Sequence, residues 1–180
     1  MKLPITKYGD PVLRRKGARI ETITPEIKKL VADMFDTMYD AHGVGLAAQQ
    51  VGHALQLTVI DVRGIKDRPS TMEVGGKSVD PDDHMPLVLI NPELKPSTET
   101  VKGGEGCLSF PEVFADITRP AEVEVSALNE KGAKVLFRAG GLLAKAVQHE
   151  FDHLQGILFI DRMTTETKKE LKPEDRKSVV

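Results

Sequence analysis

The sequence is poor in cysteine and in aromatic residues. It has one cysteine, Cys107, no tryptophan, and only 4% Phe, Trp and Tyr. A single thiol cannot form an internal disulfide, and chains without disulfides are typical of reducing compartments. We therefore expect a cytoplasmic protein that does not depend on disulfides for stability.

Long apolar runs and an excess of positive charge are also lacking. No apolar stretch approaches the roughly 20 residues of a membrane-spanning helix. The N-terminus carries Pro4, Asp10 and Pro11 where a signal peptide needs an apolar core. The formal net charge is -2, which offers no broad basic field for nucleic acid. Membrane and nucleic acid are therefore not expected as main partners.

What is present is the composition of a globular protein. The 180 residues are 40% hydrophobic and 29% charged, and we find no internal repeat. We predict one domain over residues 1–163. The remainder, 164–180, is mostly polar and contains Pro173, which would interrupt a helix, so we predict a polar tail.

Apolar spacing predicts two helices. In residues 24–43, Thr24 can cap the helix, Pro25 suits its first turn, and Gly43 can stop it. The second helix lies within 139–156, where Gly156 can end it. One of its faces is an apolar stripe made of Leu143, Val147, Phe151 and Leu154.

Strands are predicted at 55–62 and 87–91, which are rich in branched aliphatic residues. The polar segment 63–86 between them reads as a loop or small hairpin. Residues 123–139 alternate apolar and polar positions around a turn at 129–132, which predicts a further hairpin.

The second helix carries HEFDH, an H-E-x-x-H pattern. His149 and His153 are four residues apart, so on a helix their Cβ atoms lie about 5–6 Å from each other and both rings can reach one ion. Glu150 lies on the rim of the same face, within reach of a metal-bound water, and is the candidate general base.

A catalytic metal site usually takes three protein ligands, and this motif supplies two. No histidine follows His153, so the downstream third histidine of extended zincins is absent. Cys107, in GGEGCLSFPE, is the candidate third ligand, because flanking glycines let its backbone approach an ion. His42, His53 and His84 lack ligand spacing and read as loop residues.

Three motifs occur in order: GVGLAAQQ at 43–50, EGCLS at 105–109 and QHEFDH at 148–153. Together they closely resemble those of peptide deformylases, and the likeness extends over about residues 4–163. The first motif is not a nucleotide loop, because it has neither G-x-G-x-x-G nor G-K-[ST] spacing.

The resemblance implies a metal-dependent hydrolase that removes the N-formyl group from formyl-methionine on nascent polypeptides, at the ribosome. Metal-bound water would attack the formyl carbon, with Glu150 as general base and acid. Gln50 and the Leu108 amide would hold the oxyanion. The implied metal ligands are Cys107, His149 and His153, and the implied substrate contacts are Val44, Gly45, Glu105 and Leu142.

The resemblance further implies Fe²⁺ as the ion, with Zn²⁺ or Ni²⁺ as replacements, and a soft thiolate with two imidazoles suits each of them. The implied fold is α+β, with antiparallel strands packed around the metal-binding helix. The chain departs from the family pattern in its long 63–86 segment, in a tail without a clear closing helix, and in Lys145, where an apolar pocket residue also occurs.

Two other functions are compatible with parts of the pattern. A metallopeptidase that cuts internal bonds would also use H-E-x-x-H, although the missing third histidine argues against it. A protein with a closed structural metal site would need Cys107 and both histidines, but it would leave Glu150 and Gln50 without a purpose.

Overall fold

The computed structural model describes residues 1–163, so the predicted tail at 164–180 lies outside the described residues. The helices are α1 (Pro25–Asp40) and α2 (Gly141–Leu154). The strands are β1 (Gly45–Ala47), β2 (Leu57–Ile60), β3 (Ser70–Val74), β4 (Lys77–Val79), β5 (Leu87–Pro96), β6 (Thr100–Cys107), β7 (Phe110–Pro120), β8 (Glu122–Leu128) and β9 (Lys134–Gly140). Short 3₁₀ helices are η1 (Pro11–Arg14), η2 (Ala48–Val51), η3 (Pro81–His84) and η4 (Phe159–Arg162).

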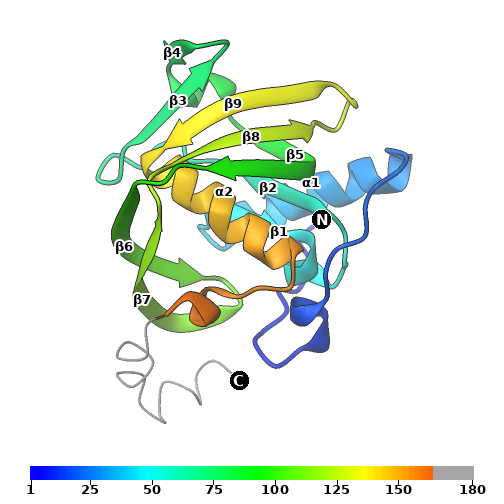
Figure 1. Ribbon diagram of the computed structural model, residues 1–180. Helices are drawn as coiled ribbons and strands as arrows, with labels where there is room; N and C mark the ends of the chain where they lie inside the picture. The colour runs from blue at the N-terminus through cyan, green and yellow to red at the C-terminus, as the bar shows by residue number, and fades with distance from the viewer. Residues whose placement is uncertain (164–180) are drawn as a thin grey trace.

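Seven strands form one sheet in the order β1-β2-β5-β8-β9-β3-β4, and β6 and β7 form a separate two-stranded sheet. Every named strand pair is antiparallel. Helix α2 runs between the large sheet and the β6–β7 hairpin (Figure 1). The predicted α+β class, with antiparallel strands around the histidine-bearing helix, is confirmed.

The two helices cover opposite faces of the large sheet, and the central strands are therefore buried on both sides. On β2, Leu57 and Val59 pack in a cluster with α1 residues, whereas Ile60 packs in a cluster with α2 residues. On β5, Val88 and Leu89 divide between the same two clusters. This explains why both strands contain adjacent apolar residues in place of strict alternation.

Helix α1 matches its prediction at the start and differs at the end. Thr24 accepts a hydrogen bond from the Ile27 amide at 3.2 Å and caps the first turn. At the other end, the expected stop at Gly43 is wrong in detail, because the left-handed residue is His42, with φ 57°. The Gly43 amide donates to the Met38 carbonyl in a Schellman-type arrangement, so Gly43 lies one residue beyond the turn.

Two predicted hairpins are present in the structure, and a further one was not predicted. Residues 63–86 contain the β3–β4 hairpin, which joins the large sheet through β9, so the hairpin reading of this segment is confirmed. The turn at Asn129–Gly132 connects β8 and β9 as predicted. The β6–β7 hairpin was not predicted. Within residues 1–163, no helix is long and apolar enough to span a membrane.

Candidate metal centre and substrate pocket

The metal-binding motif lies where α2 faces β6. His149 pairs with Glu105 across this contact, and His153 pairs with Cys107. Four residues of a helix advance about 6 Å and two residues of a strand advance about 6.6 Å. The i, i+4 spacing on the helix therefore matches the i, i+2 spacing on the strand, and each histidine has its own partner on β6.

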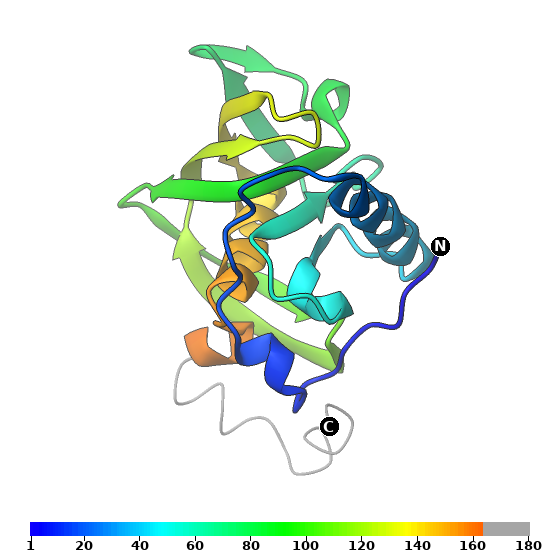
Figure 2. The ribbon, with the colours of Figure 1, turned by 90° about the vertical axis from the view of Figure 1, so that its right-hand side faces the viewer.

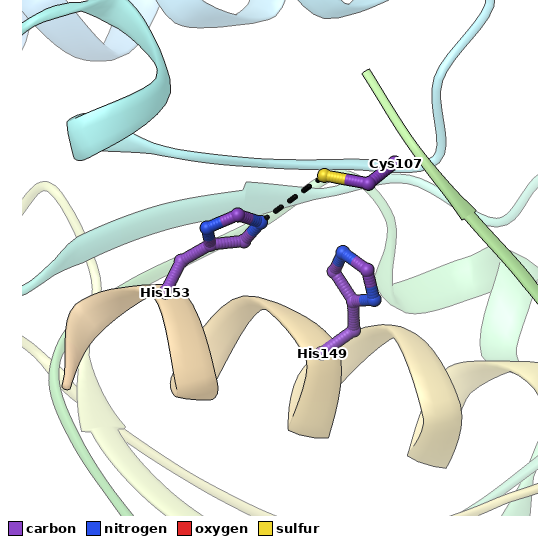
Figure 3. Close-up of side chains that lie close together, drawn as sticks. All are labelled: Cys107, His149 and His153. Carbon is purple, nitrogen blue, oxygen red and sulfur yellow. Dashed lines mark hydrogen bonds between the residues drawn. The ribbon is translucent and has the colours of Figure 1, made fainter. Parts of the chain in front are cut away.

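Cys107, His149 and His153 converge on one point (Figure 3). One potential ligand atom from each residue lies within 4.8 Å of the others. The Cys107 Sγ is 3.3 Å from His153 Nε2, and the two imidazole centroids are 5.2 Å apart. Cys107, which is 42 residues before His149 in the sequence, is thus brought to the two histidines by the fold.

The hydrogen bond on the far side of His149 fixes the orientation of its ring. Nδ1 lies 2.9 Å from the Glu105 carboxylate, which leaves Nε2 facing the cluster. Burial lowers the pKa of His149, but hydrogen bonds to Cys107 and Glu105 raise it more, and the net pKa is well above its usual value. A carboxylate behind a ligating imidazole is the usual arrangement at metal sites.

The chemistry of these residues fits a metal ion. The surroundings of His149 favour a positive charge at the cluster, which a cation can supply in place of a proton. One soft sulfur and two imidazole nitrogens suit zinc and late first-row metals. The set holds three ligands, which leaves room for a water or substrate atom, as in catalytic sites.

Glu150 is adjacent to the cluster but is not among its three members. Its side chain is buried, with Oε1 3.9 Å from His149 Nε2, and Oε2 has no hydrogen-bond partner within residues 1–163. Burial raises the Glu150 pKa to about 7. A Cβ at Gly45 would lie 2.9 Å from Glu150 Cγ, so only glycine lets β1 pass this close to the carboxylate.

Gln50 contributes an oriented amide to the same space. Its Oε1 accepts from the Ala47 amide at 2.9 Å, so its Nε2 must face the other way. Nε2 lies 3.2 Å from Ser109 Oγ and 3.6 Å from Cys107 Sγ. The 3₁₀ helix η2 therefore presents a hydrogen-bond donor beside the metal cluster.

A cavity of about 560 Å³ opens next to the cluster. The sequence-predicted residues that line it are Val44, Gly45, Gln50, Glu105, Cys107, Leu108, Leu142, His149 and Glu150. His42 also lines it, whereas the lining does not include His53 or His84. The glycine-rich motif, the cysteine motif and the histidine motif thus all border one pocket.

Sequence reasoning missed a buried ionic network behind the pocket. Arg119 on β7 donates to both Glu105 oxygens, at 2.6 and 2.9 Å, and to Asp152 at 2.9 Å. Asp152 also accepts from Arg162 on η4 at 2.6 and 2.8 Å. Asp152 is visible inside the HEFDH motif, but nothing in the sequence links it to Arg119, which lies 33 residues away.

We expect Glu105→Gln to destabilise the protein. Hydrogen bonds to His149 and Arg119 outweigh burial and hold the Glu105 pKa at about 2, below its usual 4.5. Because the folded pKa is depressed, this stabilisation is present above pH 4.5 and is lost as the pH falls toward about 2. Removing one member of a buried ion pair costs about 3–5 kcal/mol, and the remaining Asp152 contact reduces that here.

Urea unfolding of chelator-treated protein from neutral to acidic pH measures this effect. The variant should have a lower free energy of unfolding at neutral pH, and that free energy should fall less than in the wild type as the pH is lowered. Glu122→Gln is the matched control, because its pair with Arg138 is half exposed on both sides and contributes little. Equal stabilities of the two variants would contradict the assigned role of Glu105.

Comparisons with known proteins agree with the geometry. The sequence matches the family described as Polypeptide deformylase over residues 2–169. A peptide deformylase of Methylacidiphilum infernorum is 48% identical over 174 residues, covering 97% of this chain and 91% of that protein.

Solved structures are similar in fold as well. The crystal structure of peptide deformylase from Thermotoga maritima superposes with a TM-score of 0.78 at 37% identity, covering 91% of this chain and 99% of that one. A peptide deformylase from Legionella pneumophila gives 0.82 at 35% identity, covering 99% and 94%. With this fold, a site that can hold a metal, and matches over nearly its whole length, the chain belongs to the peptide deformylase family and is a metal-dependent deformylase.

Proposed function

We propose that Cys107, His149 and His153 hold one divalent ion, Fe²⁺ in the native protein, and that Glu150 moves the proton in hydrolysis of the formyl amide. The observation that carries this proposal is the separation of roles in the geometry. Three ligand atoms lie within 4.8 Å of one another, and the Glu150 carboxylate stands beside them without belonging to the set. Zn²⁺ and Ni²⁺ suit the same three ligands.

When bound, the ion lowers the pKa of a water molecule and polarises a carbonyl oxygen. Glu150 accepts the proton of the attacking water and then delivers it to the leaving amine nitrogen. Its buried Oε2, which has no hydrogen-bond partner in the described part of the chain, can exchange that proton within the pocket. The oxyanion accepts hydrogen bonds from Gln50 Nε2 and the Leu108 amide, each worth about 3 kcal/mol in comparable sites.

We further propose that the substrate backbone pairs with β1 at Gly45. Strand β1 is at the edge of the large sheet, with β2 on one side only, and Gly45 borders the pocket. An extended peptide added to a sheet edge is a common recognition mode. The methionine side chain would then enter the pocket between Val44 and Leu142.

The resemblance places Glu105 among the substrate contacts, and the structure suggests a different task. Both of its carboxylate oxygens are engaged by Arg119 and His149. We propose that Glu105 orients His149 for metal binding, and that its only contact with the substrate is as part of the pocket wall.

For the setting of the reaction, we propose nascent chains in the cytoplasm, at the ribosome. The supporting argument is chemical, since the proposed ligand set includes the only thiol of the chain, and a reducing environment protects a thiolate ligand from oxidation.

We expect formyl-methionyl peptides to be hydrolysed and matched acetyl-methionyl peptides to be hydrolysed far more slowly. The formyl carbon carries only hydrogen, whereas acetyl adds a methyl that must fit among Gly45, Glu150 and the metal ligands. Forcing one extra methyl into a packed site costs about 1–3 kcal/mol, which is roughly 10- to 100-fold in kcat/KM.

The assay compares formyl-Met, acetyl-Met and internally cleavable peptides on the iron-loaded or nickel-loaded protein. Release of internal fragments would indicate a peptidase. Absence of hydrolysis in all three cases, with metal bound, would indicate a structural site and overturn the proposed function.

A further inference from the structure

The contact between α2 and β6 contains a third pair that the reaction does not use. Lys145 is four residues before His149, and Gly103 is two residues before Glu105. A Cβ on Gly103 would overlap the Lys145 ammonium, so the lysine lies directly over this glycine. The row of Lys145, His149 and His153 on the helix thus faces the row of Gly103, Glu105 and Cys107 on the strand.

This lysine borders the substrate pocket, and within residues 1–163 it forms no ion pair with a carboxylate. It is half-buried and lines the cavity, and no hydrogen bond or ion pair joins it to another residue in 1–163. Asp116 and Glu105 attract it electrostatically, and Glu105 is already engaged by Arg119 and His149. Arg68, which also lines the cavity, donates to the Gly104 carbonyl at 2.9 Å and adds positive charge at this end.

Lys145 lies where the far end of the substrate's first side chain is expected. It is one helical turn from His149, about 6 Å along the axis. In an N-formyl-methionyl peptide the sulfur is five bonds from the formyl carbon, a reach of roughly 6 Å when extended. A formyl group at the metal cluster, with its first side chain between Val44 and Leu142, therefore brings the sulfur toward the ammonium.

A thioether is a poor acceptor for this donor. The sulfur of methionine accepts hydrogen bonds only weakly, whereas the oxygen of methionine sulfoxide is a polar group on the same atom. In a pocket lined only by apolar groups a sulfoxide would lose its bonds to water without replacement. A charged N–H donor at the end of the pocket replaces one of those bonds with a strong one.

We propose that Lys145 makes this pocket a site for N-formyl peptides whose first side chain ends in a strong hydrogen-bond acceptor, with N-formyl-methionine sulfoxide as the substrate of that class. The enzyme then deformylates chains whose initiator methionine has been oxidised. This inference rests on the proposed function and deepens it, because it concerns which first residues the same site accepts.

The test compares kcat/KM for three tripeptides that differ only in the first residue: formyl-methionine, formyl-methionine sulfoxide and formyl-norleucine. Norleucine has the same shape as methionine without an acceptor. In the metal-loaded wild-type protein, we expect the sulfoxide peptide to be within about 10-fold of the norleucine peptide, since one charge-assisted bond offsets the lost hydration.

Lys145→Met keeps the length of the side chain and removes the charge. We expect the sulfoxide-to-norleucine ratio of kcat/KM to fall by about 10-fold or more in this variant. The matched control is Lys102→Met, because Lys102 is an exposed lysine on β6, next to Gly103, and does not line the cavity. In this variant the ratio should stay at the wild-type value.

The outcomes separate this inference from the proposed function. Normal hydrolysis of formyl-methionine with an unchanged ratio in Lys145→Met shows that the lysine only runs along β6 to solvent, and overturns the inference alone. The inference is also overturned, without any variant, if wild-type kcat/KM for the sulfoxide peptide is below about 1% of that for the norleucine peptide. Loss of all three activities in metal-loaded wild-type protein overturns the proposed function and this inference with it.

Discussion

Glu150→Gln is expected to keep its bound metal and to lose roughly 10²-fold or more of its turnover. The substitution preserves the size of the side chain and leaves Cys107, His149 and His153 in place. It removes the only group assigned to carry the proton from water to the leaving amine. Metal content and kcat measured on the same preparation test both parts of this expectation.

The pH dependence gives a second measurement on the same residue. Burial raises the Glu150 pKa to about 7, and a bound cation lowers it by favouring the carboxylate. Only the carboxylate accepts a proton, so wild-type kcat/KM should fall as the pH drops through a value below about 7. The variant should lose or shift this acidic limb, whose apparent pKa belongs jointly to Glu150 and the water.

A Glu150→Gln protein that lost its metal together with its activity would show that Glu150 is a ligand. Near-normal turnover with a full complement of metal would show that another group carries the proton. Either result would remove Glu150 from the proposed role.

Replacement of any one of Cys107, His149 and His153 by alanine is expected to release most of the bound metal and with it nearly all activity. Each change leaves two ligands where a catalytic site needs three. Loss of a residue that merely supports a ligand commonly costs 10- to 100-fold in metal affinity, so loss of a ligand should exceed about 100-fold. Metal content after dialysis against a weak chelator measures the effect.

His84→Ala is the matched control for the histidines, because His84 is exposed on η3 and does not line the pocket. It should retain the wild-type metal content. A Cys107→Ala protein that kept its metal under the same dialysis would mean that the third ligand has been assigned to the wrong residue.

The helical part of the site could be predicted because its information is local. His149 and His153 are four residues apart, and the apolar stripe of α2 distinguishes the face that packs in the core from the face that carries the histidines. The ends of α1 could be predicted from the sequence only in part. Thr24 caps as expected, but the left-handed turn falls on His42, since the Schellman geometry and not the residue type sets that position.

The strand half of the site could not be predicted in the same way. Strand β6 contains Gly103, Gly104 and Gly106, which lower strand propensity and hid the β6–β7 hairpin. Gly103 and Gly106 let side chains lie directly against the strand, because a Cβ at either position would overlap the Lys145 ammonium or the Phe114 ring in its present position. The Arg119 network was also invisible, since it joins residues from four elements that only the folded chain brings together.

The position of the cluster between α2 and β6 has a consequence for the folded state as a whole. The β6–β7 hairpin packs in a hydrophobic cluster with η4, apart from the cluster that joins α2 to the large sheet. An ion held by Cys107 and His153, as proposed, would close a loop of 46 residues across these two parts. Because it would bind the folded chain and not the unfolded one, it would stabilise the folded state by mass action and add a further link between the two clusters. The supply of metal would then set the amount of folded protein in the cell as well as the activity of each molecule.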